Sequence, residues 1–135
     1  MPAGYSDTPL LKKLGIRENM KVLLIHAPAN YFQLLEKDIS RQICRQRELP
    51  DLIHFFSVST KDFEKEMKKL LKVTQKNPAA IIWVSWYKKA SGLATNLSED
   101  TIRNYALQNG LVDIKVCAVN NEWSGLKLVV PLHKR

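Results

Sequence analysis

Short apolar runs separated by amphipathic segments make up most of this sequence. Five runs have the length of a β-strand, and polar or turn-forming residues flank them. They span residues 21–27, 51–58, 79–86, 111–119 and 126–132. The first three lack a regular polar alternation, which is typical of strands covered on both faces. The last two are separated by NNEWSG and predict a terminal hairpin with Trp123 in its turn.

Helix signals lie between the apolar runs. Ser59 and Ser98 each stand where a helix would begin, and acidic residues follow in the first turn. After Ser59, apolar residues recur every three or four positions, which predicts one buried helix face with the charges on the other. Thr8-Pro9 and Gly15 mark the two ends of a short opening helix, and residues 31–37 predict another.

The alternation of these elements predicts the fold class. Buried strands that alternate with helices form a mostly parallel sheet with right-handed crossovers and helices on both faces. We therefore expect residues 1–135 to form a single three-layer α/β domain that ends in an antiparallel hairpin. Residues 38–50 carry few apolar positions among many charges, and they fit a helix as well as a loop with a short edge strand.

Positive charge is the compositional feature that bears on function. The 135 residues include 21 Lys and Arg against 13 Asp and Glu, which gives a formal net charge of +8. This balance favours acidic partners such as nucleic acid, phosphorylated small molecules or an anionic lipid surface, and it also occurs simply as a device for solubility. No apolar run approaches the roughly 18 residues that span a bilayer, and the N-terminal segment lacks the order of a signal peptide. We expect a cytoplasmic protein.

Residues that could carry catalysis or bind a metal are few and scattered. Cys44 and Cys117 have no CxxC spacing, which favours reduced thiols over a disulfide. The three histidines have no zinc-motif spacing, so we expect no metal. No serine lies in a GxSxG elbow and no carboxylate pair has a recognisable catalytic spacing, so the sequence indicates no catalytic residue.

Three motifs are similar to those of a known family. GYSDTPLLKKLGI at residues 4–16, WVSWYKKASG at 83–92 and LVDIKVCAVNNEWSGLKLV at 111–129 resemble an uncharacterised bacterial family of small proteins, classed as a domain of unknown function. The family commonly has a proline where this chain has Tyr87. The order of elements also resembles the S-adenosylmethionine-dependent methyltransferase fold. These resemblances imply a Rossmann-like fold and a bacterial cytoplasmic origin, and they imply no activity.

The turn after the first strand departs from a cofactor-binding sequence. A dinucleotide or S-adenosylmethionine site needs glycines there so that the backbone can approach the ligand closely. Residues 26–32 contain no glycine, and Pro28 removes one backbone donor. We therefore expect no cofactor. A degenerate methyltransferase with an altered cofactor loop is one alternative.

The carboxyl edge of the sheet is the candidate binding site, because ligands of open α/β sheets bind outside the carboxyl ends of the parallel strands. The sequence places hydroxyl, amine and imidazole groups near this edge, with a glycine and a tryptophan, and such groups suit an anion. These residues are His26, Ser59, Ser85, Lys88, Lys89, Ser91, Gly92 and Trp123. Each also has a purely structural interpretation, as a solvated, hydrogen-bonded or core residue. We expect a non-catalytic module that binds a small anionic ligand.

A nucleic-acid-associated protein is the second alternative. The basic residues that would contact phosphates are Lys12, Lys13, the cluster Arg41–Arg47, and the C-terminal His133, Lys134 and Arg135. They are scattered along the chain, and the aromatic residues, 8% of the total, form no interleaved stacking array. The sequence specifies no oligomeric state.

Overall fold

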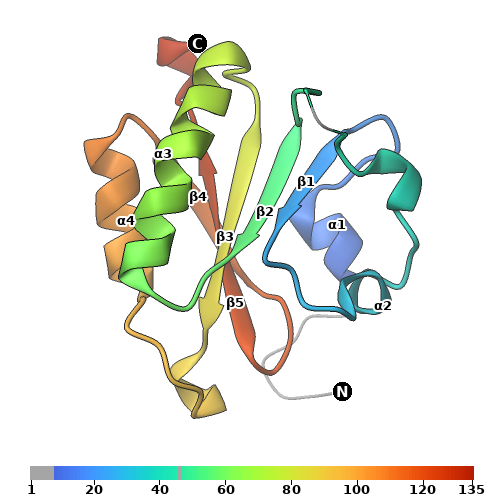
Figure 1. Cartoon of the computed structure of the whole chain (residues 1–135), viewed down its shortest axis with the longest axis vertical. Coiled ribbons are helices and arrows are strands. Elements are labelled where there is room, and N and C mark those ends of the chain that lie inside the picture. The colour runs from blue at the N-terminus through green and yellow to red at the C-terminus, as the bar shows by residue number, and fades with distance from the viewer. Residues whose placement is uncertain (1–7, 46) are drawn as a thin grey trace.

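A five-stranded mixed sheet forms the centre of the computed structural model, which describes residues 8–45 and 47–135 (Figure 1). The strands are β1 (Val22–Ile25), β2 (Leu52–Phe56), β3 (Ile81–Tyr87), β4 (Val112–Ala118) and β5 (Trp123–Val129). Their order is β1-β2-β3-β5-β4. The first three pair in parallel, and β5 lies antiparallel between β3 and β4. This confirms the predicted α/β class with its antiparallel end.

Helices cover both faces of this sheet. They are α1 (Leu10–Leu14), α2 (Tyr31–Leu35), α3 (Thr60–Lys76) and α4 (Glu99–Gln108), with short 3-10 turns at Ser40–Gln42, Lys89–Ser91 and Leu132–Lys134. α3 and α4 cover one face, and α1 and α2 cover the β1 side of the other (Figure 1). In the described part of the chain, none of the helices has the length and apolar character needed to cross a membrane. The start of the GYSDTPLLKKLGI motif, residues 4–7, lies outside the described residues.

Two apolar cores fill the space between the layers. Phe63, Met67 and Leu70 of α3 belong to the core on one face, which confirms the predicted helix stripe. Trp86 packs in that same core, whereas Trp83 packs in the core under α1 and α2. Trp83 and Trp86 are three positions apart on β3. Side chains separated by an odd number of positions on a strand point to opposite faces of the sheet, so the two tryptophans enter different cores.

The two long helices begin where the sequence predicts. The Asp62 N–H donates to Ser59 Oγ at 3.1 Å, and the Thr101 N–H donates to Ser98 Oγ at 3.2 Å. Each bond satisfies one of the N–H groups that the first helical turn leaves without a partner. The start of α1 differs from the prediction, because Pro9 and not Thr8 occupies the cap position.

Within 38–45 and 47–50, the described residues form neither a full helix nor a named strand. The Ser40 N–H donates to Asp38 Oδ1 at 2.8 Å and begins a single 3-10 turn. Ile43 then pairs with Val22 of β1 through one parallel bridge. The alternative of a loop with a short edge strand was therefore closer than a helix, because the apolar residues here are too sparse for a continuous buried face.

The terminal hairpin has a tighter turn than predicted, and this corrects the position of Trp123. Asn120 Oδ1 accepts the N–H groups of Glu122 and Trp123 at 2.9 and 2.8 Å, so one side chain closes the turn. β5 therefore begins at Trp123 and not at residue 126. Trp123 is a buried strand residue, and the prediction that it lies in a loop was wrong.

Candidate functional site

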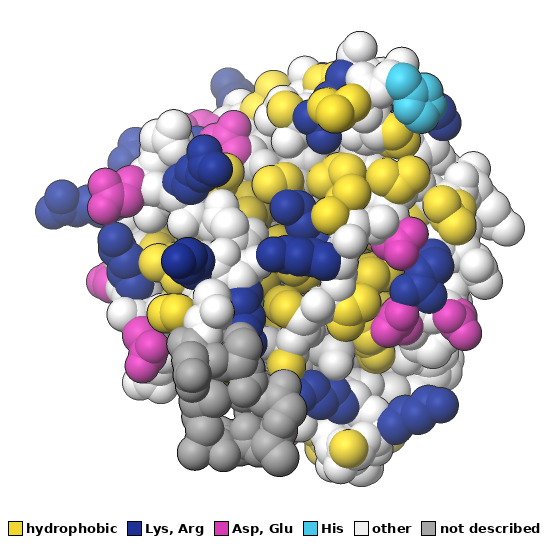
Figure 2. Space-filling view, turned by 180° about the vertical axis from the view of Figure 1, so that it is seen from behind, with side chains coloured by type: hydrophobic (Ala, Val, Ile, Leu, Met, Phe, Trp, Pro, Cys, Tyr) yellow, Lys and Arg dark blue, Asp and Glu magenta, His cyan; other side chains and the backbone are white. Residues whose placement is uncertain are grey.

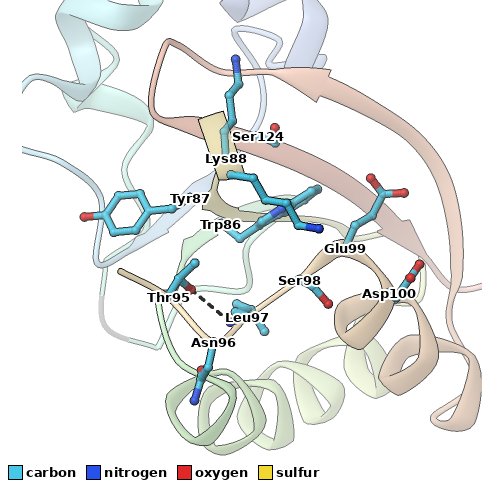
Figure 3. Close-up of a pocket in the computed structure, with 11 residues that line it drawn as sticks. Trp86, Tyr87, Lys88, Thr95, Asn96, Leu97, Ser98, Glu99, Asp100 and Ser124 are labelled. Carbon is cyan, nitrogen blue, oxygen red and sulfur yellow. Dashed lines mark hydrogen bonds between the residues drawn. The ribbon is translucent and has the colours of Figure 1, made fainter. Parts of the chain in front are cut away.

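A hollow of about 610 Å³ opens where β3 ends and α4 begins (Figure 3). Its walls come from the end of β3, the loop that follows, the segment before α4, the first turn of α4 and Ser124 of β5. It therefore lies at the carboxyl edge of the parallel strands, where ligands of open α/β sheets bind. Trp86 and Tyr87 leave β3 in opposite directions beside it (Figure 3).

The loop after β3 brings two lysines to this hollow, Lys88 and Lys89. The Lys88 N–H donates to the Glu122 carbonyl at 2.8 Å, which ties the loop to the β4–β5 turn. Ser91 Oγ donates to the Lys88 carbonyl at 2.6 Å and closes the 3-10 turn, and Gly92 ends that turn with φ 72°. That left-handed conformation favours glycine. Ser91 and Gly92 thus shape the loop that presents the lysines.

The opposite wall is the entrance to α4. Ser98 Oγ accepts the N–H of Thr101, and the Ser98 carbonyl accepts the N–H of Ile102. No bond to the N–H of Glu99 or Asp100 occurs within the described residues, so these two groups are the donors that the helix itself does not use. The positive end of the helix dipole adds to the potential of the two lysines.

Two carboxylates also line this wall, those of Glu99 and Asp100. The sequence pattern indicates them only as acids that suit the start of a helix, so they are site residues that the pattern alone does not reveal. Arg103 bonds both, with Nη1 3.1 Å from Asp100 Oδ1 and Nη2 against Glu99, while its Nε donates to Asp113 at 3.0 Å. The hydrogen bonds that Arg103 donates to Glu99 and Asp113 raise the pKa of its guanidinium. The negative charge at this wall is thus compensated by Arg103.

His26 and Ser59 lie together at the ends of β1 and β2, outside the lining of the hollow. His26 Nδ1 is 3.6 Å from Asp62 Oδ2, and Ser57 Oγ donates to the same oxygen at 2.9 Å. Ser59 Oγ already caps α3 through the Asp62 N–H. The Asp62 carboxylate is the centre of this group. Its negative charge would repel an anionic ligand, so these residues do not suit the predicted anion site.

Ser85 and Trp123 lie in the core under α1 and α2 instead of at the rim. Ser85 is fully buried two residues before the end of β3. The Trp123 ring packs edge-on against Phe56 at 5.0 Å and lies 4.2 Å from the Tyr87 ring. Of the predicted site residues, the structure therefore brings Lys88 and Lys89 to the hollow, with Ser91 and Gly92 supporting them.

A buried hydrogen-bonded chain runs through Tyr31, His54 and Ser85. Tyr31 Oη lies 2.7 Å from His54 Nδ1, and His54 Nε2 lies 2.7 Å from Ser85 Oγ. Burial lowers the pKa of His54 to about 3 and raises the pKa of Tyr31, so both groups are neutral at pH 7. The residue types are those of a nucleophile and its base, but all three side chains are buried and no substrate can reach them. His54 is a core residue, and the chain is structural.

Metal binding finds no support in the described residues, where no group of three or more His, Cys, Asp or Glu side chains could hold an ion. Cys44 and Cys117 are both free thiols.

Comparison with known proteins bears on the fold. No family model and no curated protein matches this sequence. A solved structure, described as a protein in the NADB-Rossmann superfamily from Streptococcus agalactiae, is similar over 96% of this chain and 71% of that chain, with a TM-score of 0.51 and 8% identity. The fold is Rossmann-like. At this identity the likeness extends to the fold alone.

The cofactor that such a fold often binds does not fit the residues present. The helix after β1, whose N-terminus would hold a phosphate group, has only five residues. The Tyr31 N–H at its start donates to the Pro28 carbonyl at 3.0 Å. His26, at the end of β1, has φ 55°, and no glycine follows in this turn. The Tyr31 N–H is therefore already bonded within the turn, and no glycine allows the backbone the close approach that a dinucleotide or S-adenosylmethionine requires.

Proposed function

We propose that this protein is a non-catalytic Rossmann-like module that binds a small anionic ligand in the hollow between β3 and α4 (Figure 3). The observation that carries the proposal is that Lys88, Lys89 and the first turn of α4 line the same hollow at the carboxyl edge of the sheet. Lysine ammonium groups act as point charges, and the unused N–H groups of the helix add directed donors.

The same geometry favours a ligand with two kinds of group. The anionic part faces the lysines and the start of α4. The carboxylates of Glu99 and Asp100 accept hydrogen bonds, so hydroxyl or amine groups on the ligand suit the other part of the wall. A small phosphorylated or carboxylated compound that also carries such donors fits this description better than a bare oxyanion.

A thermal-shift panel at constant ionic strength tests the proposal. The ligands are phosphate, sulfate, simple carboxylates, sugar phosphates, nucleotides, nicotinamide dinucleotides and S-adenosylmethionine. A ligand at about 100 times its Kd stabilises the native state by about 2.7 kcal/mol, which raises the Tm by several degrees. We expect a selective shift with one class of small anion, and loss of that shift in Lys88→Ala/Lys89→Ala.

The matched control is Lys68→Ala/Lys72→Ala, which removes the same charge from exposed positions on α3. It should keep the full ligand shift. An equal loss of the shift in both double variants would show an effect of net charge alone and contradict the proposed site. The absence of a shift with every anion would contradict it as well, and a shift confined to S-adenosylmethionine would favour the degenerate methyltransferase.

A further inference from the structure

The layer formed by α1 and α2 leaves part of one sheet face uncovered. One row of cross-strand neighbours shows where the cover ends. From β1 to β4 the row reads Leu24, His54, Trp83, Lys127 and Lys115. His54 and Trp83 are fully buried, Lys127 is half-buried and Lys115 is exposed. The row thus changes from core residues to lysines where the helices stop.

The two lysines at the end of this row are direct neighbours on β5 and β4. Like charges placed opposite each other in a sheet are destabilising. Burial and the charge of Lys115 both lower the pKa of Lys127. Lys115 Nζ lies 5.9 Å from the centre of the Trp83 ring, and within the described residues no carboxylate lies within 4 Å of either lysine. The folded chain keeps two adjacent cations, and a bound anion would relieve their repulsion.

Two more lysines border the same surface. Cys117 lies two residues after Lys115 on β4, and Lys13 of α1, Lys88 and Lys115 all act on its pKa in the direction opposite to burial. The strand pair Lys115 and Lys127 is thus the centre of a surface that Lys13 and Lys88 border, and we call this surface of four lysines the basic sheet face. Figure 2 looks onto this side of the molecule, where dark blue basic side chains lie among yellow hydrophobic ones at the centre of the view.

Charge complementarity indicates what this face binds. The positions of β4 and β5 that share the face with the lysine pair include no acid; they are Val112, Cys117, Trp123, Gly125 and Val129. Asp113 pairs with Leu128, whose side chain is in the core under α3 and α4, and it is bonded to Arg103. A phosphate-rich partner thus meets four cations from separate elements without meeting a carboxylate on the strands.

The shape of the face favours an extended partner. Its lysines come from α1, β4, β5 and the loop after β3, and they are spread over an open surface. Val112 and Cys117 stand before and after Lys115 on β4, are partly exposed, and suit the sugars and bases of a single strand. The Trp83 ring is covered, so it offers no stacking platform, and sequence preference should be weak.

We propose that the basic sheet face binds the phosphate backbone of single-stranded nucleic acid. This surface borders the hollow between β3 and α4 and shares Lys88 with it, but its other three lysines do not line the hollow. It also differs from the scattered contacts that the sequence suggested, because among those residues only Lys13 belongs to it. Lys115 and Lys127 are specific to the new site, and the test uses them alone.

Fluorescence anisotropy with a labelled oligothymidylate of about 20 nucleotides, titrated at several salt concentrations, tests this proposal. Each phosphate contact contributes about 0.7 to the slope of log K against log salt for single strands, so four contacts predict a slope near −3. In Lys115→Gln/Lys127→Gln we expect weaker binding and a slope smaller in magnitude by about 1.4. Lys68→Gln/Lys72→Gln, on the opposite side of the sheet, should keep the slope of the parent.

Removal of two like charges should leave the Tm of the Lys115→Gln/Lys127→Gln variant at or above that of the parent, so weaker binding will not reflect unfolding. An unchanged slope in this variant, or an equal change in the α3 control, would overturn the proposal. The same titration with vesicles rich in anionic lipid and with polyglutamate identifies the partner. Binding of either of these through Lys115 and Lys127, without binding of the oligonucleotide, would also overturn it.

Discussion

The substitution Trp83→Ala should destabilise the protein by about 3–5 kcal/mol. The Trp83 side chain is fully buried, and its Nε1 donates to the Leu14 carbonyl at 2.9 Å, so it joins β3 to the end of α1. A Cβ added to Gly125 would lie 3.2 Å from the Trp83 ring, which means that the ring packs closely against the β5 backbone. Its loss therefore removes both a large apolar group and the hydrogen bond that fixes α1.

Urea unfolding followed by circular dichroism measures this effect. A domain of ordinary stability has a free energy of unfolding of about 5–15 kcal/mol, so the alanine variant should show a much lower midpoint or be unfolded in buffer. Trp83→Phe is the matched variant, because it keeps most of the buried area and loses the bond to Leu14; its cost should be clearly smaller. Alanine and phenylalanine variants of equal stability would show that the ring does not anchor this layer.

A loss of stability below about pH 6.5 should follow from the buried imidazole of His54. Burial lowers the pKa of His54 to about 3 in the folded state, against 6.5 for an unperturbed histidine. Between these values the unfolded chain binds one proton that the folded chain does not, so the free energy of unfolding falls as the pH falls. The slope is about 1.4 kcal/mol per pH unit, and the stabilisation is fully present above pH 6.5.

The range from about pH 6.5 to pH 5 isolates this effect, because carboxylates such as Asp38, Glu48 and Asp113, whose pKa values are lowered, titrate below it. About 2 kcal/mol should be lost over this range. His54→Gln removes the titrating ring and should be less stable at pH 7, since Tyr31 and Ser85 lose at least one partner. Its stability should nevertheless change little between these two pH values. A slope as steep as that of the parent would assign the effect to another group.

Part of the candidate site could be predicted because it is local in the sequence. Lys88, Lys89 and Gly92 follow one another in a loop after a buried strand, so their place at the carboxyl edge follows from the strand alone. Ser85 and Trp123 were misplaced by two or three residues at a strand end. That distance separates a rim position from a core position. For Trp123 it was set by the Asn120 side chain that closes the hairpin turn, and for Ser85 by the continuation of β3 to Tyr87.

The basic sheet face could not be predicted. Lys115 and Lys127 become neighbours only through the register of β4 against β5, and that register shifts at a bulge between Asp113 and Lys115. A shift of one residue in a strand moves a side chain to the other face. No short-range sequence signal indicates over which strands the layer of α1 and α2 ends, and therefore which strand residues it leaves exposed.

The order of elements, the starts of α3 and α4, and the opposite faces of Trp83 and Trp86 were already present in the sequence. They depend on hydrogen bonds and side-chain periods that extend over a few residues. The tertiary structure decided the insertion of β5 between β3 and β4, the buried chain around His54, and the meeting of the lysines. These features join residues far apart in the chain, and their geometry is fixed only when the layers pack together.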